Sequence, residues 1–300
     1  MTDPLALLYR GWQEALAARP DMPLDDVRRM FEHWGDVTAE PGGIDYVEDV
    51  VGGVPGLWAL PKQRADDHVL LCMHGGGYVL GSMYSHRKLY GHFAKATGCR
   101  ALIVDYRRAP ENLHPGPVDD VVAAYAGLLG ERGIDPAHIA FVGDSAGGAL
   151  AITTMLRARE KGLLLPACSV PIAPYLDTEA KGASYDSNHG LDALGNREAT
   201  IAFMGVFLGP DGDRHDPLAN PLFADLRGLA PMLVQVGGHD VLLDDARAFC
   251  ARAAEAGGDV ALEIDPGMQH VYHFLAGNVP QADAAIARAA AWIRDRIGLA

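Results

Sequence analysis

The sequence predicts an α/β fold in which a mostly parallel central sheet is flanked by helices. Two observations carry this prediction. Short apolar runs of strand length recur along the chain, and stretches with helical periodicity separate them. The runs are too continuous to alternate polar with apolar residues, as expected for strands buried on both faces of a parallel sheet. Strands that alternate with helices indicate a doubly wound sheet.

Each element of the sheet has its own signal. The expected buried strands are HVLLCMHGG, ALIVDYR, IAFVGDS, CSVPIAPYL, MLVQVGG and VALEID. The expected helices between and after them include VDDVVAAYAGLLGER, SAGGALAITTMLRARE, LLDDARAFCARAAEA and QADAAIARAAAWIRDRI. Residues 44–60 come earlier in the chain and indicate two short strands around Gly52 and Gly53.

Two segments lie outside this alternation. In residues 1–43, the stretch PLALLYRGWQEALAA spaces large apolar residues three or four positions apart, which predicts an amphipathic helix, and a second short helix is expected after Pro23. The segment 178–223 lies between two expected strands but is far longer than a crossover helix with its loops. Such excursions are usually lids or binding loops, so both segments are expected to form a helical cap.

Composition and charge narrow the class of protein. The 300 residues are 49% hydrophobic and 21% charged, which allows a core of ordinary size. The formal net charge is -14 and no run of Lys or Arg exceeds two residues, so a nucleic-acid surface is not expected. The N-terminus lacks the pattern of an export signal, and no segment approaches the roughly 18 uninterrupted apolar residues of a membrane span. A cytoplasmic protein is therefore expected.

The cysteines give no sign of a metal or redox site. They share no CxxC spacing, which argues against a zinc cluster or a redox pair. Apolar segments surround most of them, so we expect reduced thiols in the core. The four are Cys72, Cys99, Cys168 and Cys250.

Ser145 is the candidate nucleophile. It is the serine of a GxSxG motif that follows the apolar run IAFV and precedes a helical pattern. This strand–turn–helix context displays a serine on a sharp turn, where Gly143 and Gly147 leave room for tight packing. A glycine-rich turn with a serine that caps the helix is the alternative, because the motif alone is not specific.

About seventy residues earlier, His74-Gly75-Gly76-Gly77 follows another expected strand. Successive glycines allow backbone N–H groups to converge on one point, as an oxyanion on a reacting carbonyl requires. A phosphate-binding loop is the competing interpretation. The sequence has neither a GxxxxGK[ST] lysine nor a GxGxxG after its first strand, which disfavours phosphate.

A serine nucleophile needs a base and an acid, expected in the order serine, acid, histidine. Asp240 stands where the strand PMLVQVGG ends, and His270 lies in the loop after the strand VALEID. His273 follows three residues later and is expected within the next helix. The sequence therefore predicts a triad of Ser145, Asp240 and His270 at the strand ends.

Together, the motifs HGGGYVLGS, VDYRRAPEN, FVGDSAGG, GGHDVLLDDA and GMQHVYHF resemble the α/β-hydrolase fold, in particular the bacterial hormone-sensitive-lipase-like carboxylesterases. The resemblance covers about residues 44–298. It implies N-terminal cap helices over 1–43 and a catalytic domain over 44–300 with a cap insertion at about 178–223. The cap would line the acyl and alcohol pockets.

The resemblance also implies roles for single residues. The amides of Gly76, Gly77 and Ala146 would form the oxyanion hole, with His74 and Gly75 as the supporting motif. A structural stretch beside the site would include Tyr106, Arg107, Pro110 and Glu111.

Two departures from the family pattern stand out. Relatives commonly show D-P-L-x-D-E at the acid, whereas this chain has D-V-L-L-D-D from Asp240, so Asp244 stays open as a substitute acid. Relatives show H-G-F or H-G-W at the base, where this chain has His270-Val271-Tyr272. The changed pair is expected to alter the pocket wall beside the histidine.

The expected activity is hydrolysis of short- to medium-chain acyl esters through an acyl-enzyme, with no cofactor and no metal. Lactone hydrolysis by the same triad and a non-catalytic ligand-binding protein on this fold are the alternatives. A small-molecule ester or lactone is the expected partner, and a homodimer stays open. Aromatic and Met residues at helical spacing are candidate pocket walls, although such residues more often belong to the core. They are Trp12, Phe31, Trp34, Tyr78, Met204 and Phe207.

Overall fold

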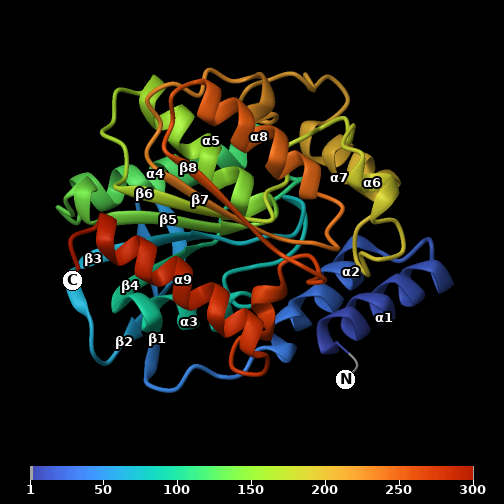
Figure 1. Ribbon diagram of the computed structural model, residues 1–300, viewed down its shortest axis with the longest axis horizontal. Coiled ribbons are helices and arrows are strands. Elements are labelled where there is room, and N and C mark those ends of the chain that lie inside the picture. The colour runs from blue at the N-terminus through green and yellow to red at the C-terminus, as the bar shows by residue number, and fades with distance from the viewer. Residues whose placement is uncertain (1–2, 300) are drawn as a thin grey trace.

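Eight strands form the central sheet of the computed structural model, which describes residues 3–299, in the order β1-β2-β4-β3-β5-β6-β7-β8 (Figure 1). β2 runs antiparallel to both of its neighbours, and the strands from β4 to β8 are parallel. The strands are β1 (Ile44–Val51), β2 (Val54–Pro61), β3 (Ala65–Met73), β4 (Cys99–Val104), β5 (Ile139–Asp144), β6 (Cys168–Ile172), β7 (Met232–Gly237) and β8 (Val260–Asp265). The α/β prediction is confirmed.

The expected hairpin at residues 44–60 is β1 and β2. Val51 pairs with Val54, which leaves Gly52 and Gly53 as a two-residue loop with φ of 60° and 78°. Positive φ at both positions defines the turn that matches the twist of a hairpin, and glycine adopts it without steric cost.

Helices cover both faces of the sheet. The helices α3 (Arg87–Thr97) and α9 (Pro280–Arg296) pack on one face, and α4 (Gly116–Gly130), α5 (Ala146–Glu160) and α8 (Leu243–Glu255) pack on the other (Figure 1). Short 3-10 turns complete the connections: η2 (Pro136–His138), η3 (Pro221–Phe223) and η4 (Tyr272–Leu275). The strands β4 to β7, and β3 from His68 onward, are consequently almost entirely buried from water.

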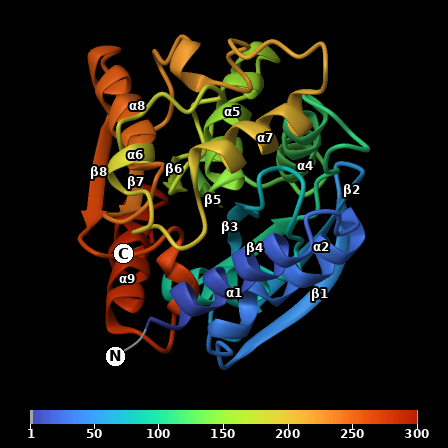
Figure 2. The same ribbon diagram turned by 90° about the vertical axis from the view of Figure 1, so that its right-hand side faces the viewer.

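The two segments outside the alternation meet at one end of the sheet. α1 (Pro4–Ala18), α2 (Leu24–Phe31) and η1 (Glu32–Val37) come from the N-terminal segment. α6 (Ser184–Ser187) and α7 (Arg197–Leu208) come from residues 178–223. Both sets of helices face the viewer in Figure 2, in front of the sheet edge. The parallel strands end at that edge, where ligands of open α/β sheets bind.

One detail of the strand prediction is wrong. VALEID was expected to be buried on both faces, but the residues of β8 are half-buried or exposed. The reason is its place in the sheet, because β8 pairs only with β7 and its outer edge faces solvent. All four cysteines are buried free thiols, as expected. Within residues 3–299, no helix combines the length and the apolar character needed to cross a bilayer.

Candidate active site

Ser145 stands on the turn between β5 and α5. Its backbone has φ of 54° and ψ of −117°, a conformation that costs free energy in a residue with a side chain. Two glycines make the turn possible. A Cβ atom on Gly143 would lie 2.1 Å from the carbonyl oxygen of Gly147, and one on Gly147 would lie 1.9 Å from that of Met73. The side chain of Ser145 is thereby displayed at the carboxyl end of the strand.

Asp240 and His270 follow β7 and β8, which are neighbours in the sheet. Asp240 Oδ2 lies 2.8 Å from His270 Nδ1, and Asp240 Oδ1 accepts the backbone N–H of Leu242 at 2.8 Å. Both side chains are buried. The carboxylate is therefore fixed by its backbone donor with its second oxygen on the imidazole.

The charge environment of His270 favours the imidazolium. Burial by itself lowers the pKa of His270, but the Asp240 carboxylate outweighs burial, with further negative charge from Asp192 and Asp144. The result is a pKa raised to about 9. A proton accepted at this histidine would be held firmly.

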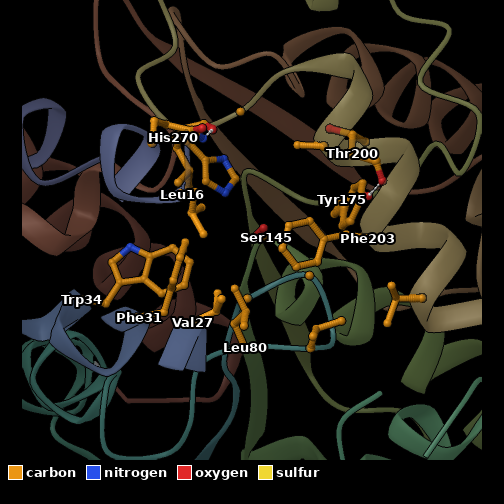
Figure 3. A pocket seen from close by; sticks show the side chains of 18 of the residues that line it. Leu16, Val27, Phe31, Trp34, Leu80, Ser145, Tyr175, Thr200, Phe203 and His270 are labelled. Atoms are coloured by element: carbon orange, nitrogen blue, oxygen red, sulfur yellow. Dashed lines mark hydrogen bonds between the residues drawn. The ribbon is translucent and has the colours of Figure 1, made fainter. Parts of the chain in front are cut away.

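Ser145 and His270 line one cavity of about 540 Å³. Figure 3 shows Ser145 between two apolar walls, with Phe31 and Trp34 on one side and Phe203 on the other. No hydrogen bond between Ser145 and His270 is present among the described residues. Such bonds are often long in ligand-free sites and tighten in the substrate complex, so the pair remains suited to proton transfer.

The oxyanion-hole candidates surround the same serine. Gly76 and Gly77 line the cavity, and no hydrogen bond within residues 3–299 uses their amide N–H groups. Ala146 is the first residue of α5, a position whose N–H has no partner inside the helix. Three backbone donors are thus available beside Ser145.

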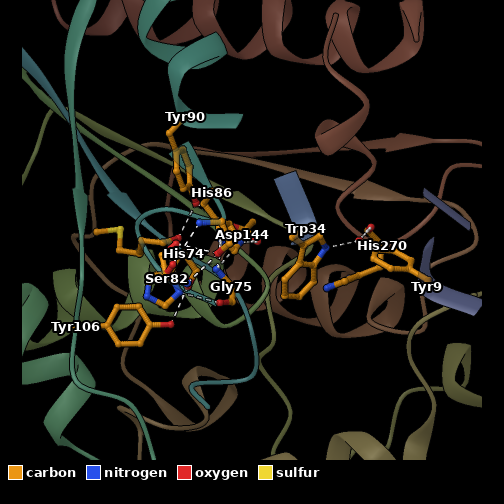
Figure 4. Close-up of polar contacts among 12 residues, drawn as sticks. Tyr9, Trp34, His74, Gly75, Ser82, His86, Tyr90, Tyr106, Asp144 and His270 are labelled. Carbon is orange, nitrogen blue, oxygen red and sulfur yellow. Dashed lines mark hydrogen bonds and ion pairs between the residues drawn. The ribbon is translucent and has the colours of Figure 1, made fainter. Parts of the chain in front are cut away.

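Asp144 binds the glycine-rich loop to the serine turn (Figure 4). Its carboxylate is fully buried and accepts from the Tyr90 hydroxyl at 2.6 Å and from the Gly75 amide at 3.2 Å. His86 Nε2 lies 3.3 Å from the other oxygen. None of these partners is His270, so Asp144 holds the glycine-rich loop, whereas Asp240 hydrogen-bonds His270.

His74 and the stretch after β4 support the same loop. The Tyr106 ring stacks on His74 with ring centroids 4.2 Å apart, and the Tyr106 hydroxyl donates to the His74 carbonyl at 2.8 Å. Burial lowers the pKa of His74 to about 3, so this ring stays neutral. Glu111 pairs with Arg28 of α2, which ties the stretch to the N-terminal helices.

The competing acid and histidine are placed elsewhere. Asp244 accepts the Ser184 amide at 2.8 Å and pairs with Arg247, both away from His270. His273 is fully buried, and its Nε2 lies 3.0 Å from Gln235 Oε1. Of the four side chains considered for acid and base, the structure joins only Asp240 with His270 among the described residues.

The cavity walls match the sequence expectation in part. Phe31 and Trp34 line the cavity, whereas the other four candidates are buried in the core: Trp12, Tyr78, Met204 and Phe207. The sequence analysis did not single out Phe203, although it lies on α7 with Met204 and Phe207 and lines the cavity. Its ring is 3.0 Å from where a Cβ atom of Gly77 would be. The apolar character of α7 was visible in the sequence, but not which of its sides faces the cavity.

Two further residues near His270 were not singled out from the sequence. The buried Tyr9 hydroxyl donates to the His270 carbonyl at 3.0 Å and accepts from Trp34 Nε1 at 3.0 Å (Figure 4). Asp192 lines the cavity beside His270. Neither residue belongs to a recognisable motif.

A possible metal site lies at the other end of the parallel strands. Potential ligand atoms there, from Asp67, His68 and His138, lie within 4.8 Å of one another. The two imidazole rings stack at 4.0 Å with an interplanar angle of 15°. In-plane lone pairs of parallel rings do not converge on one ion, so the geometry favours a stacked pair. Asp67 and His68 lie near the start of β3 and His138 lies directly before β5, whereas Ser145 follows the carboxyl end of β5.

Comparisons with known proteins show which family this chain resembles. The family described as the alpha/beta hydrolase fold matches residues 70–274. An acetyl-hydrolase of Streptomyces hygroscopicus is 38% identical over 90% of this chain and 88% of its own length. An esterase of Acinetobacter venetianus is 36% identical over 76% of this chain and 75% of its own length.

Solved structures extend the likeness to the whole fold. The crystal structure of an esterase from the bacterial hormone-sensitive lipase family superposes with a TM-score of 0.93 at 43% identity. The superposition covers 99% of this chain and 100% of that one. The helices at the sheet edge are therefore part of the shared architecture.

Proposed function

This chain belongs to the α/β-hydrolase fold, among the hormone-sensitive-lipase-like carboxylesterases, and from that premise we propose that it hydrolyses short- to medium-chain acyl esters through Ser145, Asp240 and His270. The observation that carries the proposal is the buried Asp240–His270 pair, whose histidine lines the same cavity as Ser145. The residues 1–43 and 178–223 serve in it as the cap that closes the cavity.

The reaction begins with attack on the ester carbonyl. His270 Nε2 removes the proton of Ser145, whose Oγ forms a bond to the carbonyl carbon. Asp240 keeps the proton on Nδ1, so that Nε2 is the free acceptor, and stabilises the imidazolium that forms. The tetrahedral intermediate carries a negative oxygen, which accepts hydrogen bonds from the amides of Gly76, Gly77 and Ala146. Each donor contributes about 3 kcal/mol to lowering the barrier.

The tetrahedral intermediate then collapses to the acyl-enzyme, which is hydrolysed in turn. His270 gives its proton to the leaving alcohol as the carbon–oxygen bond breaks, and Ser145 keeps the acyl group. A water molecule repeats the attack with His270 again as base, and the acid and free serine are released. Every step uses side chains and amides of this chain.

The substrate class follows from the walls of the cavity. Apolar side chains dominate the lining, and the volume of about 540 Å³ lies in the usual range for small-molecule sites. Such a cavity favours an uncharged ester with a compact acyl chain. The name of the Streptomyces relative, an acetyl-hydrolase, supports the same class.

Hydrolysis of p-nitrophenyl acetate and butyrate by wild type and Ser145→Ala tests the proposal. We expect kcat of the variant to fall on the order of 10⁴-fold or more, because no other group replaces the nucleophile. A rapid burst of p-nitrophenol in the wild type would report the acyl-enzyme and distinguish an enzyme from a binding protein. Equal turnover by both proteins would refute Ser145 as the nucleophile.

A further inference from the structure

Residues 188–195, named here the bridging segment, connect α6 with α7 and touch the loop that carries Asp240. Asn188 Nδ2 donates to the carbonyl oxygen of Asp240 at 2.8 Å and to that of Gly238 at 3.1 Å. Asp192 Oδ2 accepts the backbone N–H of Val241 at 2.9 Å. The bridging segment therefore hydrogen-bonds the loop after β7 before, at and after Asp240.

The bridging segment also holds the loop of the base. Gln269, the residue before His270, accepts the Ala193 amide at 2.9 Å through Oε1. Its Nε2 donates to the Leu191 carbonyl at 3.0 Å. The bridging segment thus hydrogen-bonds both the loop after β7 and the loop after β8, although it is distant from them in the sequence.

Asp192 is the charged member of this segment. Its Oδ1 accepts the amides of Leu194 and Gly195, both at 2.8 Å, and its Oδ2 accepts that of Val241. The side chain is buried, yet it lines the cavity together with His270. Three backbone donors compensate for burying the carboxylate, and they fix its position.

We propose that Asp192 is a positioning residue of the active site, which holds the Asp240 loop in place and sets a second negative charge beside His270. This inference rests on the proposed esterase mechanism and deepens it. In that mechanism His270 gains a positive charge when it takes the Ser145 proton. A fixed carboxylate nearby stabilises this charge without having to reorient during the reaction.

The ionisable groups around His270 come from four parts of the chain. Asp240 hydrogen-bonds the ring, Asp192 faces it from the bridging segment, Asp144 acts from the end of β5, and the Tyr9 hydroxyl of α1 binds its carbonyl. Burial and the Asp240 charge raise the pKa of Asp192, while the imidazolium opposes them. The charges on Asp192 and His270 therefore depend on each other.

The test is the pH profile of kcat/KM for p-nitrophenyl butyrate between pH 5 and 10, measured with wild type and Asp192→Asn. Loss of the negative charge lowers the pKa of the histidine, so the acidic limb of the profile should move to lower pH. We expect kcat to fall on the order of tenfold with little change in KM, because the lost interaction is strongest in the transition state.

Asp216→Asn is the matched control. Asp216 also lies in residues 178–223 and accepts a backbone N–H, that of Leu218 at 2.9 Å, but it does not line the cavity. The control should keep the wild-type profile. Asp192→Glu retains the charge and should keep the acidic limb near its wild-type position even where kcat falls.

The outcomes distinguish the role of Asp192 from the proposed esterase function. A folded Asp192→Asn protein whose acidic limb coincides with that of wild type overturns the inference, since a purely structural role predicts only a lower melting temperature. If Asp192→Asn does not melt cooperatively, Asp192→Ser, which keeps an acceptor for the amides of the segment, is measured with the same expected shift. Activity retained by Ser145→Ala would instead overturn the proposed function.

Discussion

Replacing Asp240 by Asn should damage the site in a way that the structure specifies. Asp240 Oδ1 accepts the Leu242 amide, so the Asn oxygen will stay there and its NH₂ group will face His270 Nδ1. Nδ1 must then accept a hydrogen bond, which moves the ring proton to Nε2. An imidazole protonated at Nε2 cannot take the proton of Ser145.

The expected fall in kcat of Asp240→Asn has two causes. A shift of the His270 pKa from 6.5 to about 9 corresponds to roughly 3 kcal/mol of preferential stabilisation of the imidazolium. Most of it comes from Asp240, and its loss alone would cost on the order of 100-fold in rate. With the wrong tautomer added, we expect kcat to fall by about 10⁴-fold.

The pH dependence supplies an independent check. In the proposed mechanism His270 accepts a proton only when it is neutral, so the rate of wild type should rise with pH up to about 9. Without Asp240, burial dominates and lowers the histidine pKa, so the residual activity should reach its plateau at lower pH.

The assay is p-nitrophenyl butyrate hydrolysis from pH 5 to 10, with Asp244→Asn as the control of equal chemistry. The control should retain nearly the wild-type rate. A kcat for Asp240→Asn within tenfold of wild type, with an unmoved acidic limb, would refute this account of the acid.

Three further predictions follow from single contacts. Gly147→Ala should lower the melting temperature by calorimetry and abolish esterase activity, because the new methyl group would lie 1.9 Å from the Met73 carbonyl oxygen; a wild-type melting curve would contradict the packing described. Tyr9→Phe leaves the His270 carbonyl without its donor and should cost about 1–3 kcal/mol of unfolding free energy in urea titrations, with a lower kcat. Phe203→Ala opens the wall above the glycine loop and should raise KM for p-nitrophenyl butyrate more than for the acetate, since each lost methylene contact is worth about 0.8 kcal/mol; equal changes in both would argue against that wall as the acyl site.

The sheet and the candidate site differ in how far the sequence predicts them. Ser145, Asp240 and His270 each follow an apolar run, and parallel strands bring such positions to one edge, so their meeting could be expected from chain order. The exposure of β8 could not, because an apolar run is the same in a central and an edge strand until the strand order is known.

Which side chains of α1, α2 and α7 line the cavity could not be predicted for a related reason. Trp12 and Phe31 have ring centroids only 4.3 Å apart, yet Phe31 reaches the cavity and Trp12 does not. Helical spacing tells which face of a helix is apolar, but not whether that face meets the core or a cavity. Asp192 is a further case, because two of its three donors are amides of the irregular segment that carries it, and the third is the Val241 amide in the loop after β7.

The hydrogen bond from Tyr9 to His270 joins residues 261 positions apart. During synthesis Tyr9 is added first, then Ser145, and His270 after both. A chain synthesised only as far as Ser145 therefore has neither His270 nor the hydrogen bond that Tyr9 donates to it.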